Sequence, residues 1–161
     1  MLSFPNAKIN LGLQITHKRT DGYHDLNTLF IPIPYTDALE FVPAADTHFE
    51  SIGLPIQGAV ADNLVLKAYH LLQQDFPQIP ALKIVLHKII PMGAGLGGGS
   101  ADGTFMLRML NDTYQLGLST DQLITYALAL GSDCPFFVYN QPCFATGRGE
   151  ALEPIQIDAL Q

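Results

Sequence analysis

The stretch from Pro91 to Asp102 reads PMGAGLGGGSAD and places five glycines in the seven residues from Gly93 to Gly99. Glycine inside a helix or strand is destabilising by about 1 kcal/mol relative to alanine, so such a cluster indicates positive φ or a close approach to another group. Main-chain amides of a loop can converge on an anion, and a helix that follows adds unpaired N–H groups. The loop is a candidate phosphate site; the alternative is a tight strand-to-helix turn without a ligand.

Two common phosphate loops do not fit this stretch. Gly93, Gly95 and Gly98 satisfy the spacing of the dinucleotide fingerprint, but residues 112–130 predict a loop and a second helix where that fold needs a parallel strand. The P-loop requires a lysine between its last glycine and the following Ser or Thr, and no lysine precedes Ser100 here. Both interpretations are therefore excluded.

The elements before the loop have the pattern of strands. Ile9, Leu11, Leu13 and Ile15 alternate with polar residues or glycine, which predicts a half-buried strand. Asp-Gly at 21–22 predicts a hairpin turn, and residues 29–33 and 39–42 predict further strands. The first fifty residues therefore predict an antiparallel meander.

The remaining elements alternate between helices and strands. A helix capped by Asp62 or Asn63 should end before Pro77, and residues 82–86 predict a strand that leads into the glycine loop. Ser100 is expected to open the next helix, and residues 120–130 predict another that Gly131 closes. Residues 136–139 and 142–146 are expected to pair as short strands. The whole reads as one α+β layer fold.

Composition excludes several classes of partner. Eight basic residues stand against fifteen acidic ones, giving a net charge of −7, so a nucleic-acid or anionic-membrane partner is not expected. No apolar run reaches the length of a spanning helix, and the first residues lack the pattern of a signal peptide, which indicates a cytoplasmic protein. The five histidines lack metal-ligand spacing, and Cys134 and Cys143 are expected to be reduced core residues.

The low charge content suggests that part of the surface meets another domain or subunit. Charged residues make up only 14% of the chain, and Ile155, Ile157 and Leu160 continue an apolar pattern up to Gln161. We therefore expect the fold to continue beyond this sequence.

Several sequence blocks together resemble a known family. The pattern P-x-G-x-G-L-G-x-S resembles the phosphate-binding signature of the GHMP small-molecule kinases, and within them the chain is similar to the 4-diphosphocytidyl-2-C-methyl-D-erythritol kinases. The blocks that carry the resemblance are residues 6–13, 21–24 with 28–30, 63–68, 88–102, 131–137 and 145–150.

The resemblance implies a fold, a reaction and partners. Residues 1–161 would form the N-terminal ATP-binding domain, an α+β fold with an antiparallel or mixed sheet and helices packed on one face. The family phosphorylates the 2-hydroxyl of 4-diphosphocytidyl-2-C-methyl-D-erythritol (CDP-methylerythritol) in non-mevalonate isoprenoid biosynthesis, with ATP as co-substrate and Mg²⁺ expected. Its C-terminal domain, absent here, would pack on this one. We expect residues 1–161 alone to bind nucleotide weakly and turn over poorly.

The resemblance assigns most of the nucleotide contacts to the glycine loop, with Asn63 and Lys88 flanking the adenine nucleotide. Ser100 would offer its hydroxyl to phosphate or to Mg²⁺. From the residues alone, Ser100 and Asn63 are equally well explained as helix caps. The loop residues expected to bind ATP are Pro91, Met92, Gly93, Ala94, Gly95, Leu96, Gly97, Gly98, Gly99, Ser100 and Ala101.

Two residues match the family's catalytic pair. Asp133 would accept or orient the proton of the attacking hydroxyl, and the Lys8 ammonium would lie beside it. The alternatives are an N-cap role for Asp133 ahead of Pro135 and an ordinary strand-edge charge for Lys8.

Three further residues match the substrate side. Tyr23 would stack on the cytosine, His24 would hydrogen-bond to it, and Asn10 would reach the substrate side of the cleft. Packing at the rim of the site is the alternative for Tyr23 and His24. The rival functions are another GHMP kinase, of the homoserine or mevalonate type, and a nucleotide-binding module without catalysis.

Overall fold

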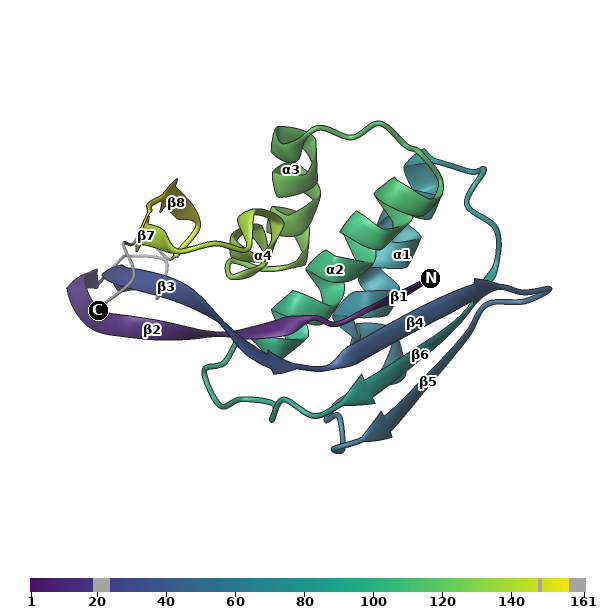
Figure 1. Cartoon of the computed structure of the whole chain (residues 1–161), viewed down its shortest axis with the longest axis horizontal. Helices are drawn as coiled ribbons and strands as arrows, with labels where there is room; N and C mark the ends of the chain where they lie inside the picture. Colours follow the sequence, from purple (N-terminus) through teal and green to yellow (C-terminus); the bar gives the residue numbers. More distant parts are fainter. Residues whose placement is uncertain (19–23, 148, 157–161) are drawn as a thin grey trace.

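The computed structural model describes residues 1–18, 24–147 and 149–156, which form two sheets and a group of helices (Figure 1). The first sheet has the order β1-β4-β6-β5, and the second has the order β2-β3-β7-β8. The predicted α+β class is confirmed. The strands are β1 (Leu2–Ser3), β2 (Asn6–Lys18), β3 (His24–Thr36), β4 (Ala38–Pro43), β5 (His48–Gly53), β6 (Leu82–Lys88), β7 (Cys143–Thr146) and β8 (Ala151–Pro154).

Helices cover one face of the first sheet, as the resemblance implied. Figure 1 shows α1, α2 and α3 on the same side of β1, β4, β6 and β5. The main hydrophobic core lies between these layers and includes Phe41, Tyr69, Leu86 and Leu107. The helical segments are a short 3₁₀ turn η1 (Val60–Asp62), α1 (Leu64–Asp75), α2 (Gly98–Thr113), α3 (Thr120–Leu130) and α4 (Cys134–Tyr139).

Local signals in the sequence account for most helix ends. The Asn63 side chain accepts a hydrogen bond from the amide of Val65 at 2.9 Å, so it caps α1. Ser119 and Gln122 form a capping box at the start of α3, and Gly131 follows its end. Helix α2, however, begins at Gly98 with Gly97 at the cap, so the prediction that Ser100 opens it is wrong by two residues.

The predicted meander is correct only for the β2–β3 hairpin. β4 pairs antiparallel with β6, and β5 pairs parallel with β6, so a single strand distant in sequence, β6, separates β4 from β5. The continuous antiparallel arrangement expected for the first fifty residues is therefore wrong, because β4 and β5 both pair with β6 and not with each other. The predicted turn at residues 21–22 lies outside the described residues.

The segment 136–139 is helical, which contradicts the predicted strand pair. Pro135 occupies the first turn of α4, where its missing amide hydrogen costs no hydrogen bond and its fixed φ suits a helix. Asn140 then ends the helix in the left-handed conformation, with φ of 49°. β7 pairs instead with β3 and β8.

β2 carries exposed apolar side chains, unlike the half-buried strand predicted. Ile9, Leu11, Leu13 and Ile15 are between 37% and 62% exposed. A bulge interrupts the pairing with β3 between Leu11 and Leu13, where Gly12 has φ of 71°. Within the described part of the chain, no helix covers these four side chains. In the described part of the chain, no helix is long and apolar enough to cross a membrane.

Both cysteines are buried and free, and we expect them to be unreactive in the folded chain. Burial raises the pKa of Cys134 to about 11 and that of Cys143 to about 11, so neither forms the reactive thiolate at neutral pH. A disulfide reagent should therefore label neither thiol in native buffer, and both after unfolding in guanidinium. Rapid labelling without denaturant would contradict this description of the core.

Candidate active site

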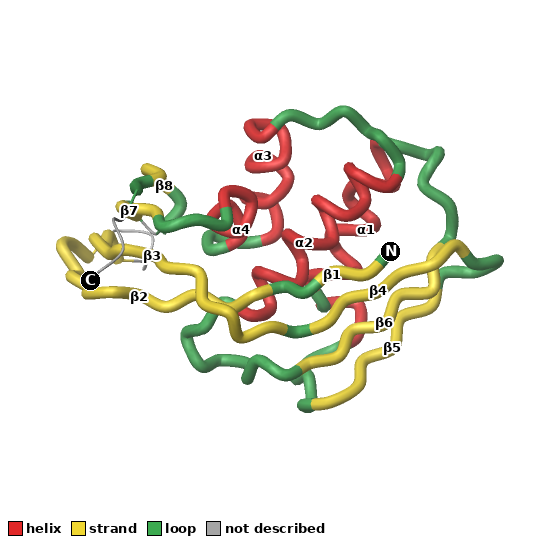
Figure 2. The backbone as a smooth tube through the Cα atoms, in the orientation of Figure 1, coloured by secondary structure: helices red, strands yellow, loops and turns green. Residues whose placement is uncertain are grey.

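The glycine loop connects the end of β6 to the start of α2 (Figure 2). Gly93, Gly95 and Gly97 have φ of 72°, 74° and 70°, a conformation that side chains other than glycine rarely adopt. The loop and Leu64 line a cavity of about 280 Å³. No loop or cap hydrogen bond to the amides of residues 92–100 occurs in the described part of the chain, so these donors are available to a ligand.

The last turn of the loop has no room for residues larger than glycine, because neighbouring side chains occupy the space that a Cβ would need. A Cβ at Gly97 would lie 2.9 Å from the Phe137 ring and 3.1 Å from Lys8 Cγ. A Cβ at Gly98 would lie 2.8 Å from Ile90 Cγ2 and 2.9 Å from Lys88 Nζ. Gly97 and Gly98 at the start of α2 therefore pack closely against Lys8 and Lys88, two residues that are far apart in the sequence.

Lys8 connects the loop to the carboxylate predicted to be catalytic. Its main-chain amide donates to the carbonyl of Leu96 at 2.9 Å, and its Nζ lies 3.6 Å from Asp133 Oδ2. Nζ also donates to Asn10 Oδ1 at 2.6 Å and lies 4.5 Å from the centre of the Phe30 ring. The chain therefore brings Lys8, Asn10 and Asp133 together beside the loop.

Asp133 is placed to receive a ligand. It occupies the cap position of α4, but its side chain makes no capping hydrogen bond and is 37% exposed. Gly149, with φ of 103°, approaches it from the turn before β8, and a Cβ there would lie 3.8 Å from Asp133 Oδ1. The capping role considered for Asp133 is thus absent, and the carboxylate faces Lys8.

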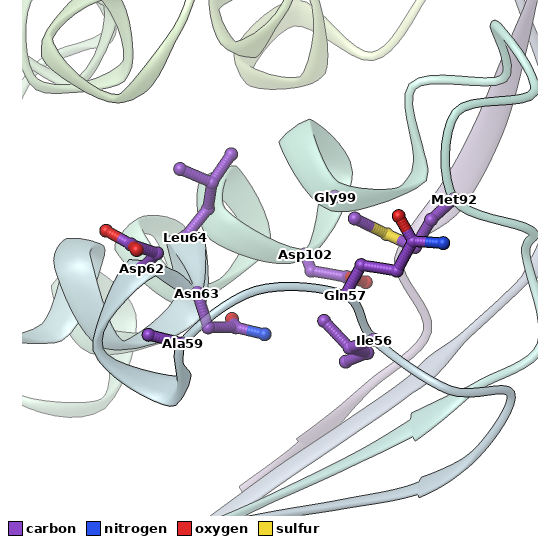
Figure 3. A pocket seen from close by; sticks show the side chains of 9 residues that line it. All are labelled: Ile56, Gln57, Ala59, Asp62, Asn63, Leu64, Met92, Gly99 and Asp102. Atoms are coloured by element: carbon purple, nitrogen blue, oxygen red, sulfur yellow. The ribbon is translucent and has the colours of Figure 1, made fainter.

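A second, smaller cavity adjoins the loop (Figure 3). Its volume is about 100 Å³, and it shares Leu64, Met92 and Gly99 with the loop cavity. Ile56, Leu64 and Met92 give it apolar walls, while polar groups lie on its remaining sides. The polar residues that line it are Gln57, Asp62, Asn63 and Asp102.

The predicted nucleotide residue Lys88 is buried under the loop rather than exposed in either cavity. It is 1% exposed, and its Nζ donates to Asp37 Oδ2 and, at 2.7 Å, to Asp102 Oδ2. Burial raises the pKa of Asp102 to about 7; the Lys88 charge lowers it and the Asp37 charge raises it. A contact of the Lys88 side chain with nucleotide stays a prediction, since its hydrogen bonds here are intramolecular.

Sequence reasoning missed several residues of the site. Asp37 lies in no motif, and Phe30 and Phe137 look like ordinary core residues, yet they contact Lys88, Lys8 and the Gly97 position. Tyr23 lies outside the described residues, and for His24 only the main chain in β3 is described. In the described ranges, no three His, Cys, Asp or Glu side chains are grouped to hold a metal ion.

Comparison with known proteins identifies the domain. The family described as "GHMP kinases N terminal domain" matches residues 63–141, which include the glycine loop. A crystal structure of 4-(cytidine 5'-diphospho)-2C-methyl-D-erythritol kinase superposes with a TM-score of 0.82 and 36% identity, over 98% of this chain and 56% of that one. The chain has the fold of the GHMP kinase N-terminal domain.

Relatives named 4-diphosphocytidyl-2-C-methyl-D-erythritol kinase are identical to this chain at about half of the aligned positions. The one from Bacteroides thetaiotaomicron is 54% identical over an alignment 161 positions long that covers 98% of this chain and 58% of that protein. The one from Azobacteroides pseudotrichonymphae is 51% identical over 158 residues, which is 98% of this chain and 59% of that protein. This chain thus spans less than two thirds of the relatives that it matches.

Mevalonate kinases share the fold at much lower identity. The crystal structure of the Methanococcus jannaschii mevalonate kinase has a TM-score of 0.70 and 16% identity, over 97% of this chain and 56% of that chain. This likeness concerns the fold alone.

Proposed function

We propose that the protein, at the length of its relatives, transfers the γ-phosphoryl group of ATP to the 2-hydroxyl of CDP-methylerythritol. The observation that carries the proposal is the position of Lys8, whose main chain holds the glycine loop while its ammonium lies 3.6 Å from Asp133. The names of relatives about 50% identical to the chain support the choice of substrate.

In this proposal the two adjoining cavities hold the two halves of ATP. The polyphosphate lies over the amides of the glycine loop and the start of α2, where the helix dipole favours negative charge. The base enters the smaller cavity between Ile56, Leu64 and Met92, with Asn63 on its polar side. Pro91 and Ala101 bound the loop at its two ends.

The transfer step needs positioning and charge more than covalent chemistry. The Asp133 carboxylate accepts the proton of the 2-hydroxyl as that oxygen attacks the γ-phosphorus, and the bond from the γ-phosphorus to the β,γ-bridging oxygen breaks to release ADP. The Lys8 ammonium, fixed by Asn10 and the Asp133 carboxylate, stabilises negative charge on the transferred group. Mg²⁺ bound to the phosphates would neutralise further charge, and the Ser100 hydroxyl at the start of α2 is the protein oxygen suited to contact it.

Substrate recognition requires residues other than those that carry out the transfer. We assign Asn10, Tyr23 and His24 to the cytidine substrate, because Asn10 already lies beside the catalytic pair. We further propose that a C-terminal domain, present in the relatives, packs on this one. The exposed apolar residues of β2 offer surface for such packing.

A substrate panel tests the proposed function. The chain would be continued into the remaining part of the Bacteroides thetaiotaomicron relative, which is 54% identical to it. We expect ATP-dependent phosphorylation of CDP-methylerythritol at a kcat/KM at least about 10³-fold above that for mevalonate or homoserine, because a site with cytosine contacts rejects substrates that lack the base. Equal activity on mevalonate would favour the rival kinases, and ATP binding without any transfer would favour a binding module.

A further inference from the structure

Three charged side chains are buried together beneath the glycine loop. Asp37, Lys88 and Asp102 are 0%, 1% and 2% exposed. Lys88 Nζ donates to one oxygen of each carboxylate, and the second oxygen of Asp102 has no partner within the described residues. Buried ion pairs are weak contributors to stability compared with well-packed apolar residues, so this cluster calls for a role other than stabilising the core.

The cluster joins the sheet to the two stems of the loop, which are the segment that enters it from β6 and the segment that leaves it in α2. Lys88 is the last residue of β6, immediately before the loop, and Asp102 lies in the first turns of α2, immediately after it. Asp37 occupies the single-residue link between β3 and β4. One side-chain contact therefore spans the loop, from its entering stem to its leaving stem.

Asp37 also fixes the main chain that enters the loop. Its Oδ1 accepts hydrogen bonds from the amides of Ile89 at 2.5 Å and Ile90 at 2.8 Å, while its Oδ2 accepts from Lys88. These are charge-assisted and directional bonds, which hold a backbone in one orientation more strictly than apolar packing does.

The Lys88 ammonium supports the leaving stem from below. A Cβ at Gly98 would lie 2.9 Å from Nζ, so the ammonium lies directly under the first residue of α2. Gly98 and its neighbours line the loop cavity, and their amides are donors without a loop or cap hydrogen bond in the described part of the chain. A shift of the ammonium would tilt these donors.

We propose that Asp37, Lys88 and Asp102 are positioning residues that fix the spacing of the loop's two stems and thereby aim its amides at a polyphosphate. This inference rests on the proposed function for the identity of the ligand. It predicts that the cluster affects binding of the phosphates more than binding of the base, because Asp102 alone of the three lines the base cavity, whose walls include Ile56, Leu64 and Met92.

The test compares ligands with and without phosphates. Lys88→Met leaves two unpaired carboxylates and is prone to unfold, so the informative variant is the uncharged Asp37→Asn, Lys88→Met, Asp102→Asn triple variant. We expect it to fold and to bind the ATP analogue AMPPNP with Mg²⁺, and tripolyphosphate, more than about tenfold more weakly. The loss of affinity for adenosine should be smaller, because Asp102 alone of the three lines the base cavity. Lys83→Met, the same change on the exposed part of β6, is the matched control.

Two results separate this inference from the proposed function. The NMR chemical shifts of the amides of Gly93 to Gly99 can be measured on isotope-labelled chains without ligand. These shifts should differ between the triple variant and the Lys83→Met control. Unchanged loop shifts, or unchanged tripolyphosphate affinity in the folded triple variant, would overturn the positioning role. Failure of the unmodified chain to bind any phosphate ligand would refute the proposed function, and the loop shifts would still decide the positioning role.

Discussion

Replacing Asp133 with asparagine is expected to lower kcat for phosphoryl transfer by about 10³-fold while changing ATP affinity by less than about threefold. Asparagine keeps the size and a carbonyl oxygen near Lys8 but cannot accept the hydroxyl proton. Because the carboxylate lies beside the loop and not among the residues of either loop cavity, nucleotide contacts should persist. Steady-state kinetics of the chain continued into the Bacteroides thetaiotaomicron relative, together with calorimetric titration of ATP, measures both quantities.

Asp121→Asn provides the control for this prediction. Asp121 is an exposed carboxylate in the first turn of α3, so its loss should leave kcat unchanged. An Asp133→Asn enzyme with kcat near that of the control would show that the carboxylate does not handle the proton. Equal losses of kcat and ATP affinity would instead assign Asp133 to binding.

Replacing Gly97 with alanine is expected to weaken nucleotide binding by more than about thirtyfold. Alanine is strained at φ of 70°, and its Cβ would meet the Phe137 ring at 2.9 Å and Lys8 Cγ at 3.1 Å. Relief of these contacts must move the loop or the catalytic lysine. The affinity is measured by titrating the isotope-labelled variant with AMPPNP in the presence of Mg²⁺ and following the NMR chemical shifts of its amides.

Gly117→Ala separates backbone strain from local crowding. Gly117 has φ of 72°, but a Cβ there would meet nothing within 4 Å, and it lies in the connection between α2 and α3. Both substitutions should lower the free energy of unfolding by about 1 kcal/mol for the strained φ alone. Only Gly97→Ala should affect nucleotide binding; similar affinities for the two variants would argue against contact between the loop and the nucleotide.

The parts of the site that the sequence predicts are those with local causes. Five glycines in seven residues indicate a loop of unusual backbone, and Asn63 marks the start of α1 through its bond to the amide two residues away. Lys8 and Asp133 were matched by family resemblance, since nothing local shows that their side chains meet.

The parts that sequence reasoning missed depend on tertiary contacts. Asp37 takes its role only because β4 pairs with β6 and thereby lies next to Lys88. The residues Phe136 to Tyr139 have strand-like composition, but Pro135 and the cover provided by α2 and α3 favour a helix. Parallel pairing of β5 with β6 has no signature in either strand alone.

The most direct test of the proposed polyphosphate site is an NMR titration of the isotope-labelled 161-residue chain with AMPPNP and Mg²⁺, in which the chemical shifts of the amides are followed. If the glycine loop holds the polyphosphate, the largest changes should fall on the amides of Gly95 to Ser100, with a change in the Lys8 side-chain resonances as the terminal phosphate approaches. Saturable shifts confined to other parts of the chain, with the loop amides unmoved, would contradict the account.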